Sequence, residues 1–341
     1  MKPASIISIF IALVLIVGGY FLCAYARSTA PSDAAIDGTT SLSEDGNVVT
    51  ELTLAGQTFS KVNVSVSGCK VEIHGGAEAS YITLVNFNEN TYIAAAGEKV
   101  LTVSNRISFL DYFNLDGTGV TFSGVWKTLR SFFTYDTSEA EREIHIYLGS
   151  DAEISQINVN VDKGTTLRLV DIDKNCDVTV KTVNSNAEIS NVNVASMSVS
   201  GSGSDISIGN SSANNFEYTA TSTKFIANNF VCENILLESS ASDISLLNAD
   251  FRNITAALGT SNLTLSTKYD RTSYFRKIQI NEGVITENET EIGQKDESAE
   301  ESFGMLPGNM TLTVESGSIN ITFGVEILPP AITEDTQTPA A

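Results

Sequence analysis

The stretch Ser204-Asp-Ile-Ser-Ile-Gly-Asn210 returns further along the chain as Ser242-Asp-Ile-Ser-Leu-Leu-Asn248. Half of the distance between them is the basic period. The segment 166–279 divides into lines of nineteen residues, and each line opens with a hydroxyl residue: Thr166, Ser185, Ser204, Thr223, Ser242 and Ser261. A fixed period of this length is typical of proteins built from stacked repeats.

Residues one period apart share the same character. One apolar column contains Val170, Ile189, Ile208, Ala227, Leu246 and Leu265, and a second contains Val159, Val178, Met197, Phe216, Ile235 and Ile254. A column of asparagine contains Asn191, Asn210, Asn229 and Asn248. Within each line apolar and polar residues alternate, which indicates short strands with one buried face, and Asn, Ser, Gly and Asp between them favour turns.

These patterns predict an all-β fold, a single-stranded parallel β-helix (a solenoid) with coils of about nineteen residues. Equivalent residues of neighbouring coils would then lie about 4.8 Å apart, the spacing of paired strands. A twisted β-sandwich is the alternative, but sandwiches do not require a strict spacing between strands. Each coil needs a neighbour to cover its apolar face, so the ends of the solenoid must be capped.

The N-terminal region contains an uncharged apolar run at residues 6–26. About twenty apolar residues suffice to span a bilayer. Lys2 precedes the run and only Arg27 follows it closely, which predicts a single-pass membrane protein with a cytoplasmic N-terminus and an extracytoplasmic body. Ala24-Tyr-Ala26 also fits a signal-peptidase site, so a cleaved signal peptide is the alternative.

Composition and local patterns divide the rest of the chain. We expect a membrane anchor or signal peptide at 1–27, a flexible spacer at 28–46, the β-solenoid at 47–325 and a disordered tail at 326–341. The segment 282–302 is rich in acidic residues and is expected to be a solvated loop. The strands within 62–103 would start or cap the solenoid, and the strand pair within 310–323 would close it.

An aromatic insertion at 107–135 interrupts the pattern. Phe109, Trp126 and Phe133 within it are candidates for a surface that meets a membrane or a partner. The alternative is that the insertion folds back and plugs the apolar end or side of the coil.

Few residues suggest metal or catalytic chemistry. Asp171, Asp173 and Asp177 are candidate calcium ligands, but the segment lacks the glycine and glutamate of a calcium loop, so a solvated corner is the alternative. His74 and His145 are the only histidines, and we expect outward strand residues rather than ligands, because no second ligand stands at metal spacing. No Cys-x-x-Cys occurs, so the sequence gives no support for a zinc site or a thiol-redox site. The cysteines are expected to be small buried residues, and no cofactor is expected.

The membrane segment, the Ser-Asp-Ile-Ser-Ile coils and the closing Gly317-Ser-Ile-Asn-Ile-Thr-Phe-Gly324 together resemble a family of bacterial envelope proteins. That family is labelled "putative adhesin" and contains a β-strand-repeat domain of unknown function. The resemblance covers about residues 47–325. It implies a β-solenoid on the outer side of the cytoplasmic membrane, and the family has no established catalytic residues.

The sequence therefore predicts a non-enzymatic, membrane-anchored protein with an adhesin-like binding role or a structural or sensing role in the cell envelope. Its ligand would be an unknown surface or cell-wall component. Nucleic acid is not expected, because 41 acidic residues against 20 basic ones give a net charge of −21. The alternative is a glycan-active β-helix enzyme, a polysaccharide lyase or hydrolase. A groove lined by three or more outward carboxylates and a basic residue would favour that enzyme.

Overall fold

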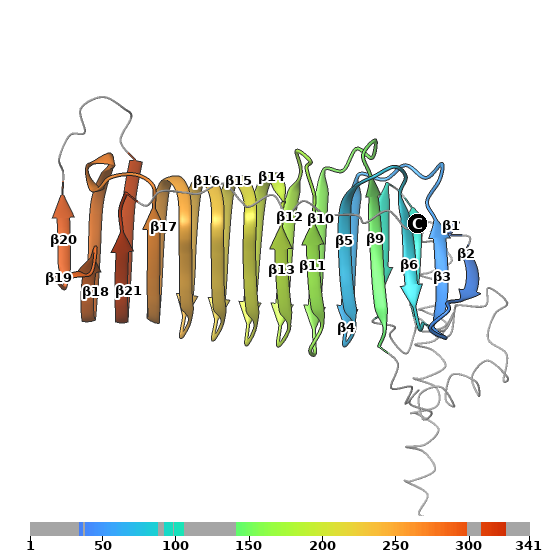
Figure 1. The fold of residues 1–341 in the computed structure, drawn as a ribbon, viewed down its shortest axis with the longest axis horizontal. Helices are drawn as coiled ribbons and strands as arrows, with labels where there is room; N and C mark the ends of the chain where they lie inside the picture. The colour runs from blue at the N-terminus through green and yellow to red at the C-terminus, as the bar shows by residue number, and fades with distance from the viewer. Residues whose placement is uncertain are drawn as a thin grey trace, which may run out of the picture.

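The computed structural model describes residues 34–36, 38–87, 92–97, 99–105, 141–298 and 308–324, which form one sheet wound into a long row of coils (Figure 1). The one helical element in this part of the chain is the short 3-10 turn η1 (Arg271–Ser273). The strands are β1 (Ala34–Ala35), β2 (Gly38–Leu42), β3 (Val48–Thr53), β4 (Lys61–Ser67), β5 (Lys70–Ala77), β6 (Tyr81–Val85), β7 (Ile93–Gly97), β8 (Val100–Ser104), β9 (Glu143–Gly149), β10 (Gln156–Asp162), β11 (Thr166–Val170), β12 (Asp177–Val183), β13 (Asn186–Ser190), β14 (Asn193–Ser202), β15 (Asp205–Thr221), β16 (Lys224–Ser240), β17 (Asp243–Thr267), β18 (Tyr274–Glu287), β19 (Thr290–Gly293), β20 (Lys295–Ser298) and β21 (Gly308–Thr322).

The nineteen-residue stacking from β12 to β17 is confirmed by the strand register. All of these pairings are parallel, and each joins residues nineteen apart. One buried apolar column therefore contains Val178, Met197, Phe216, Ile235 and Ile254, none of them more than 3 % exposed. The fold is all-β and solenoid-like, as the repeat predicts.

The first predicted member of each apolar column was wrong. Ile157, not Val159, pairs with Val178, and Leu169, not Val170, pairs with Ile189. The offsets there are 21 residues (157 to 178) and 20 residues (169 to 189), because each turn of this coil holds one extra residue. The extra residues shift the register, so the nineteen-residue rule fails at this coil.

The asparagine column lies at one corner of the coils. Asn191, Asn210, Asn229 and Asn248 all have a positive φ, between 47° and 54°. Asparagine tolerates this left-handed conformation better than most residues, which explains its repetition. Its side chains also bond between coils, as where Nδ2 of Asn229 donates to Oδ1 of Asn210 at 3.0 Å.

The hydroxyl column lies at the other corner and is buried. Oγ of Ser204 accepts a hydrogen bond from the backbone N–H of Ser185 at 3.3 Å, and Oγ of Ser261 accepts one from the N–H of Ser242 at 3.2 Å. These hydroxyls satisfy backbone donors that the turn leaves without a strand partner. The hydroxyl residue that opens each line from Ser185 to Ser261 is therefore needed inside the coil, whereas in the first line Thr165 takes this place and the predicted Thr166 is exposed.

The order of the coils in space differs from their order in the chain at both ends (Figure 1). At one end, β4 lies between β8 and β10, and β5 lies between β9 and β11. At the other end, β21 lies between β17 and β18. The expectation that 310–323 closes the solenoid was therefore wrong, because β18 with β19 and β20 lies beyond it.

Two segments expected to be irregular contain strands. Most of the acidic segment 282–302 continues β18 and turns back as β19 and β20, which pair antiparallel with β18. Ile285 is buried there, and Asp296 pairs with the buried Arg276, so this part of the chain joins the fold despite its acidic composition. Within the expected spacer 28–46, β2 pairs antiparallel with β3 and adds an exposed edge strand.

Several expectations concern residues outside the described part of the chain. They include the apolar run at 6–26, the aromatic insertion at 107–135 and the tail at 326–341. Among the described residues, no helix has the length and apolar character needed to cross a membrane.

Candidate functional site

One outer face of the solenoid collects a cluster of ionisable side chains. It is formed by β6, β9, β5, β11 and β13, which lie side by side in that order. Alternate side chains of each strand point outward, and the register aligns them in rows across the face. One row contains Thr83, His145, Glu72, Arg168 and Glu188.

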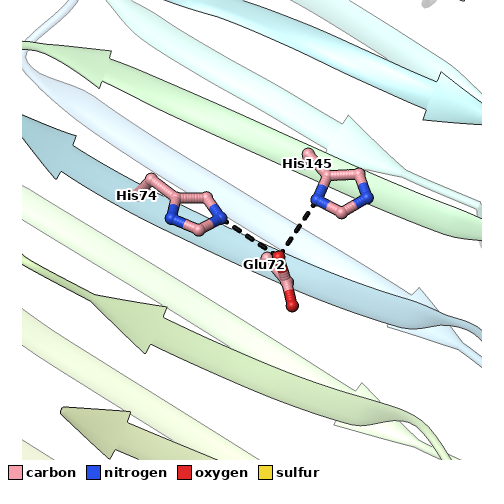
Figure 2. A group of neighbouring side chains, drawn as sticks. All are labelled: Glu72, His74 and His145. Atoms are coloured by element: carbon pink, nitrogen blue, oxygen red, sulfur yellow. Dashed lines mark hydrogen bonds and ion pairs between the residues drawn. The ribbon is translucent and has the colours of Figure 1, made fainter. Parts of the chain in front are cut away.

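Glu72 is the centre of this cluster, and its side chain is only 9 % exposed. Its Oε2 lies 3.1 Å from Nε2 of His74 and 3.2 Å from Nδ1 of His145 (Figure 2). Its Oε1 lies 3.1 Å from an Nη of Arg168 and 3.3 Å from Nζ of Lys70. The two carboxylate oxygens therefore have different partners: imidazoles on one side and permanent cations on the other.

A second carboxylate supports the cluster from β9. Oε2 of Glu143 lies 2.9 Å from Nε2 of His145 and 3.2 Å from Nζ of Lys70. His145 thus has a carboxylate near each ring nitrogen, and Lys70 bridges the two glutamates. The described residues provide no hydrogen-bond partner for the buried Nδ1 of His145, although Glu72 is close.

The surroundings of Glu72 favour its ionised form. Burial alone would raise the pKa of this carboxyl, but hydrogen bonds from His74, Lys70 and Arg168 outweigh that effect and lower the pKa to about 2. The carboxylate is therefore negatively charged throughout the neutral pH range. Its negative charge attracts cations although the carboxylate is largely buried.

An aromatic stack borders the cluster. The ring centroid of Tyr147 lies 4.9 Å from that of His74, with 11° between the two ring planes. It lies 4.3 Å from the ring centroid of Tyr81, with 14° between the planes. Burial and the nearby Tyr81 and Glu72 raise the pKa of the Tyr147 hydroxyl. The stack holds the imidazole of His74 in one orientation and leaves three rings partly exposed.

A shallow groove of about 300 Å³ continues the face on the other side of Glu72. It is lined by Thr166, Leu167, Asn186, Ala187, Glu188, Asp205, Ile206, Ser207, Lys224 and Ile226. Arg168 links it to the cluster through an ion pair with Glu188 at 3.2 Å. The groove contains two carboxylates, Glu188 and Asp205, whereas a glycan-active enzyme is expected to have three or more.

The predicted calcium ligands do not converge on a common point. Asp171 and Asp173 are exposed and accept hydrogen bonds from Asn191 at 3.0 Å and Asn193 at 2.9 Å, on the next coil. Asp177 is exposed at the start of β12. Phe109, Trp126 and Phe133, the predicted binding surface, lie outside the described residues. Cys69, Cys176 and Cys232 are buried free thiols, as expected.

The expectation that no second ligand accompanies the histidines was based on sequence spacing, and the structure places Glu72 beside both rings. Glu72, His74 and His145 are the one group of three or more His, Cys, Asp or Glu residues in the described ranges that could hold a metal ion. The pairing of β5 with β9 brings them together across a long interval of sequence. A signal existed in the repeated triplet Glu-Ile-His, which occurs at 72–74 and again at 143–145.

The chain is thus an all-β solenoid with a polar and aromatic outer face. The model of the Toastrack DUF4097 family matches residues 110–323, more than half of the chain, and the protein belongs to that family. This membership confirms the resemblance noted in the sequence. No curated protein matches the chain.

Solved structures that match this chain have low sequence identity to it and low TM-scores. A "putative adhesin" from Bacteroides fragilis NCTC 9343 is 12 % identical, with a TM-score of 0.44, over 81 % of this chain and 96 % of that one. A "putative lipid binding protein" from Parabacteroides distasonis ATCC 8503 is 8 % identical, with a TM-score of 0.45, over 85 % and 99 %. A "putative adhesin" from Parabacteroides merdae ATCC 43184 is 10 % identical, with a TM-score of 0.39, over 86 % and 99 %.

Proposed function

We propose that the protein is a non-enzymatic, adhesin-like binding protein of the cell envelope. Its binding surface is the outer face that contains the Tyr81–Tyr147–His74 stack, the Glu72 cluster and the adjoining groove. The observation that carries this proposal is the continuity of the three features across neighbouring strands. Binding sites typically combine apolar or aromatic area with a few fixed polar groups.

The rigidity of the sheet supports this role. Residues of the face project from strands that are paired on both sides and anchored by a continuous apolar core. Side chains placed on paired strands hold their positions better than side chains on loops, and less ordering is needed when a ligand binds. Flat aromatic rings add contact area with little loss of side-chain freedom.

We also propose that residues 6–26 tether the protein to the cytoplasmic membrane, with the solenoid on the outer side. The support is the uncharged apolar run and the position of Lys2 before it. Membrane fractions should retain the full-length chain after a high-salt wash, and protease added to intact cells should degrade the solenoid. Release of a shortened chain into the medium would instead favour a cleaved signal peptide.

The binding proposal is tested with the full-length protein in detergent micelles on an array of envelope glycans and cell-wall fragments. Tyr147→Ala should lower retention on the bound component at least tenfold. Tyr269→Ala is the matched control, because Tyr269 is an exposed tyrosine (37 %) outside this face. Equal losses in both variants would contradict the assignment of the face, and release of sugar fragments would identify an enzyme instead.

A further inference from the structure

We infer that Glu72, His74 and His145 form a binding site for a divalent transition-metal ion, with Zn²⁺ as the best fit. Each of the three residues offers a ligand atom within 4.8 Å of the others, and the candidate atoms are Oε2 of Glu72, Nε2 of His74 and Nδ1 of His145 (Figure 2). This site lies within the proposed binding face, but it does not depend on which envelope component binds there, so the inference goes beyond the proposed function.

The two distances from the carboxylate oxygen are close to those of tetrahedral coordination. Oε2 of Glu72 lies 3.1 Å and 3.2 Å from the two imidazole nitrogens. Zinc bonds of 2.0–2.2 Å at tetrahedral angles place neighbouring ligand atoms about 3.3–3.5 Å apart. An ion bound between them would replace the hydrogen bond between Nε2 of His74 and Oε2 of Glu72, with release of its proton.

The second nitrogen of His145 fixes which atom can bind. Nε2 of this ring lies 2.9 Å from Oε2 of Glu143, and a proton placed between them leaves the lone pair on Nδ1. A carboxylate behind a histidine ligand is the usual support of a zinc-bound imidazole. The sheet thus provides a supporting carboxylate as well as the ligands.

The buried Nδ1 of His145 gives further support for a cation at this position. It has no hydrogen-bond partner among the described residues, although Oε2 of Glu72 is 3.2 Å away. Two ligands of one ion show this arrangement, because each lone pair is directed at the ion and not at the other ligand. A buried polar atom without a partner is costly, and a bound cation would remove that cost.

The cations near Glu72 do not occupy the proposed position. Arg168 and Lys70 contact Oε1, while Oε2 faces the two imidazoles. They hold the carboxylate in place in the way that outer-shell partners hold metal ligands. Two imidazoles and one carboxylate favour zinc and similar ions over Ca²⁺ and Mg²⁺, which prefer all-oxygen sites.

Three protein ligands leave a fourth position open. The side chains of His74 and His145 are 25 % and 16 % exposed, so this position faces solvent on the outer side of the sheet. Water or a donor atom from another molecule would complete the coordination, as in other zinc sites with three protein ligands.

The test uses the full-length protein in detergent, stripped with a chelator and titrated calorimetrically with ZnCl₂. We expect one saturable site, which millimolar CaCl₂ does not displace. CoCl₂ should produce the visible absorption of tetrahedral Co²⁺. Since the chain contains only these two histidines, any imidazole ligation can be assigned to this site.

Variants distinguish the site from general attraction to an acidic surface. His145→Gln and His74→Gln should each lower Zn²⁺ affinity at least 100-fold, and Glu143→Gln should lower it 10- to 100-fold. Two controls leave the ligands intact. Glu188 pairs with Arg168 but provides no ligand, so Glu188→Gln removes a nearby charge only. The double variant Asp171→Asn with Asp173→Asn removes exposed carboxylates, and the Zn²⁺ affinity of both controls should stay within twofold of wild type.

Absence of saturable binding, displacement by CaCl₂ or equal affinity in His145→Gln would overturn the inference. The cluster would then be an ion-pair network without a metal. Far-UV circular dichroism of each variant separates lost ligation from lost folding. Glu143→Gln keeps the inference testable if a histidine variant fails to fold. The glycan array has a readout of its own, so failure of the metal site and failure of the proposed function are distinguishable.

Discussion

At the scale of single residues, each repeated residue type has a specific conformational task. The corner asparagines have a left-handed backbone conformation, and their side chains connect neighbouring coils. The buried hydroxyls satisfy backbone donors at the opposite corner. The period seen in the sequence is therefore the period of the turns as much as that of the apolar core.

Substitution of a corner asparagine tests this explanation. Asn229 has φ of 52° and donates to Asn210 at 3.0 Å. Asn229→Ala should reduce the free energy of unfolding by about 1–2 kcal/mol, because alanine is strained in this conformation and the side-chain bond is lost. Asn229→Gly also loses the side-chain bond, but glycine adopts this backbone conformation without strain. The free energy of unfolding should therefore fall less than in Asn229→Ala. Urea denaturation measures both, and the reverse ranking would contradict the explanation.

The pH dependence of stability tests the surroundings of Glu72. The folded-state pKa of about 2 lies below the ordinary value of 4.5. Ionised Glu72 therefore stabilises the fold above pH 4.5, and this contribution is lost as the pH falls toward 2. Between pH 5 and pH 2.5, wild type should lose about 2–3 kcal/mol more than Glu72→Gln in chelator-treated samples.

The control for this experiment is Glu188→Gln. Glu188 also pairs with Arg168, but its side chain is 50 % exposed. Its removal should leave the pH dependence close to that of wild type, because exposed ion pairs contribute little. Identical pH curves for wild type and Glu72→Gln would show that the cluster does not favour ionised Glu72.

At the scale of elements, the ends of the solenoid must cover the apolar columns. At the β18 end, Arg276 stands in register with Met310 of the buried column, and its side chain is 3 % exposed. The guanidinium lies 3.0 Å from Asp296 on β20 and 6.0 Å from the ring centroid of Phe323. The cap thus replaces an apolar stack with a buried ion pair and an aromatic contact.

Removal of this cap residue should be costly. Arg276→Ala leaves Asp296 with a reduced set of partners and opens the end of the column, so we expect a loss of about 3 kcal/mol in the free energy of unfolding. Arg252→Ala is the matched control, because its pair with Glu233 is exposed and should contribute at most about 1 kcal/mol. Thermal and urea denaturation measure the difference, and equal losses would exclude a capping role for Arg276.

At the scale of the whole molecule, the repeat pattern predicted the solenoid but not the order of the strands in space. The nineteen-residue period predicted the all-β solenoid and the core column from Val178 to Ile254, because stacking repeats the same environment. It could not predict the positions of β5 and β21, since insertion of a coil between two others leaves the pattern within each coil unchanged. The Glu72 cluster was missed for this reason, as its residues meet only through the pairing of β5 with β9.

Deletion of one complete coil tests the repeat at this scale. Removal of residues 205–223 joins Ser204 to Lys224, which stands in register with Asp205. Each coil contacts only its neighbours, so the shortened chain should fold cooperatively with a modest loss of stability. Removal of residues 205–214 alone takes out about half a coil. It should prevent native packing, because each following strand would be placed on the wrong side of the solenoid. Circular dichroism and thermal denaturation distinguish the two chains.

The placement of β21 also affects how the protein resists unravelling. The last described strand of the chain does not lie at the rim of the row, because β17 holds it on one side and β18 on the other. Fraying from the carboxyl terminus would have to break two ladders of backbone bonds together, whereas a rim strand breaks one. A steady pull on Phe323 should therefore meet shear resistance, because two ladders break together, instead of peeling one strand from the rim.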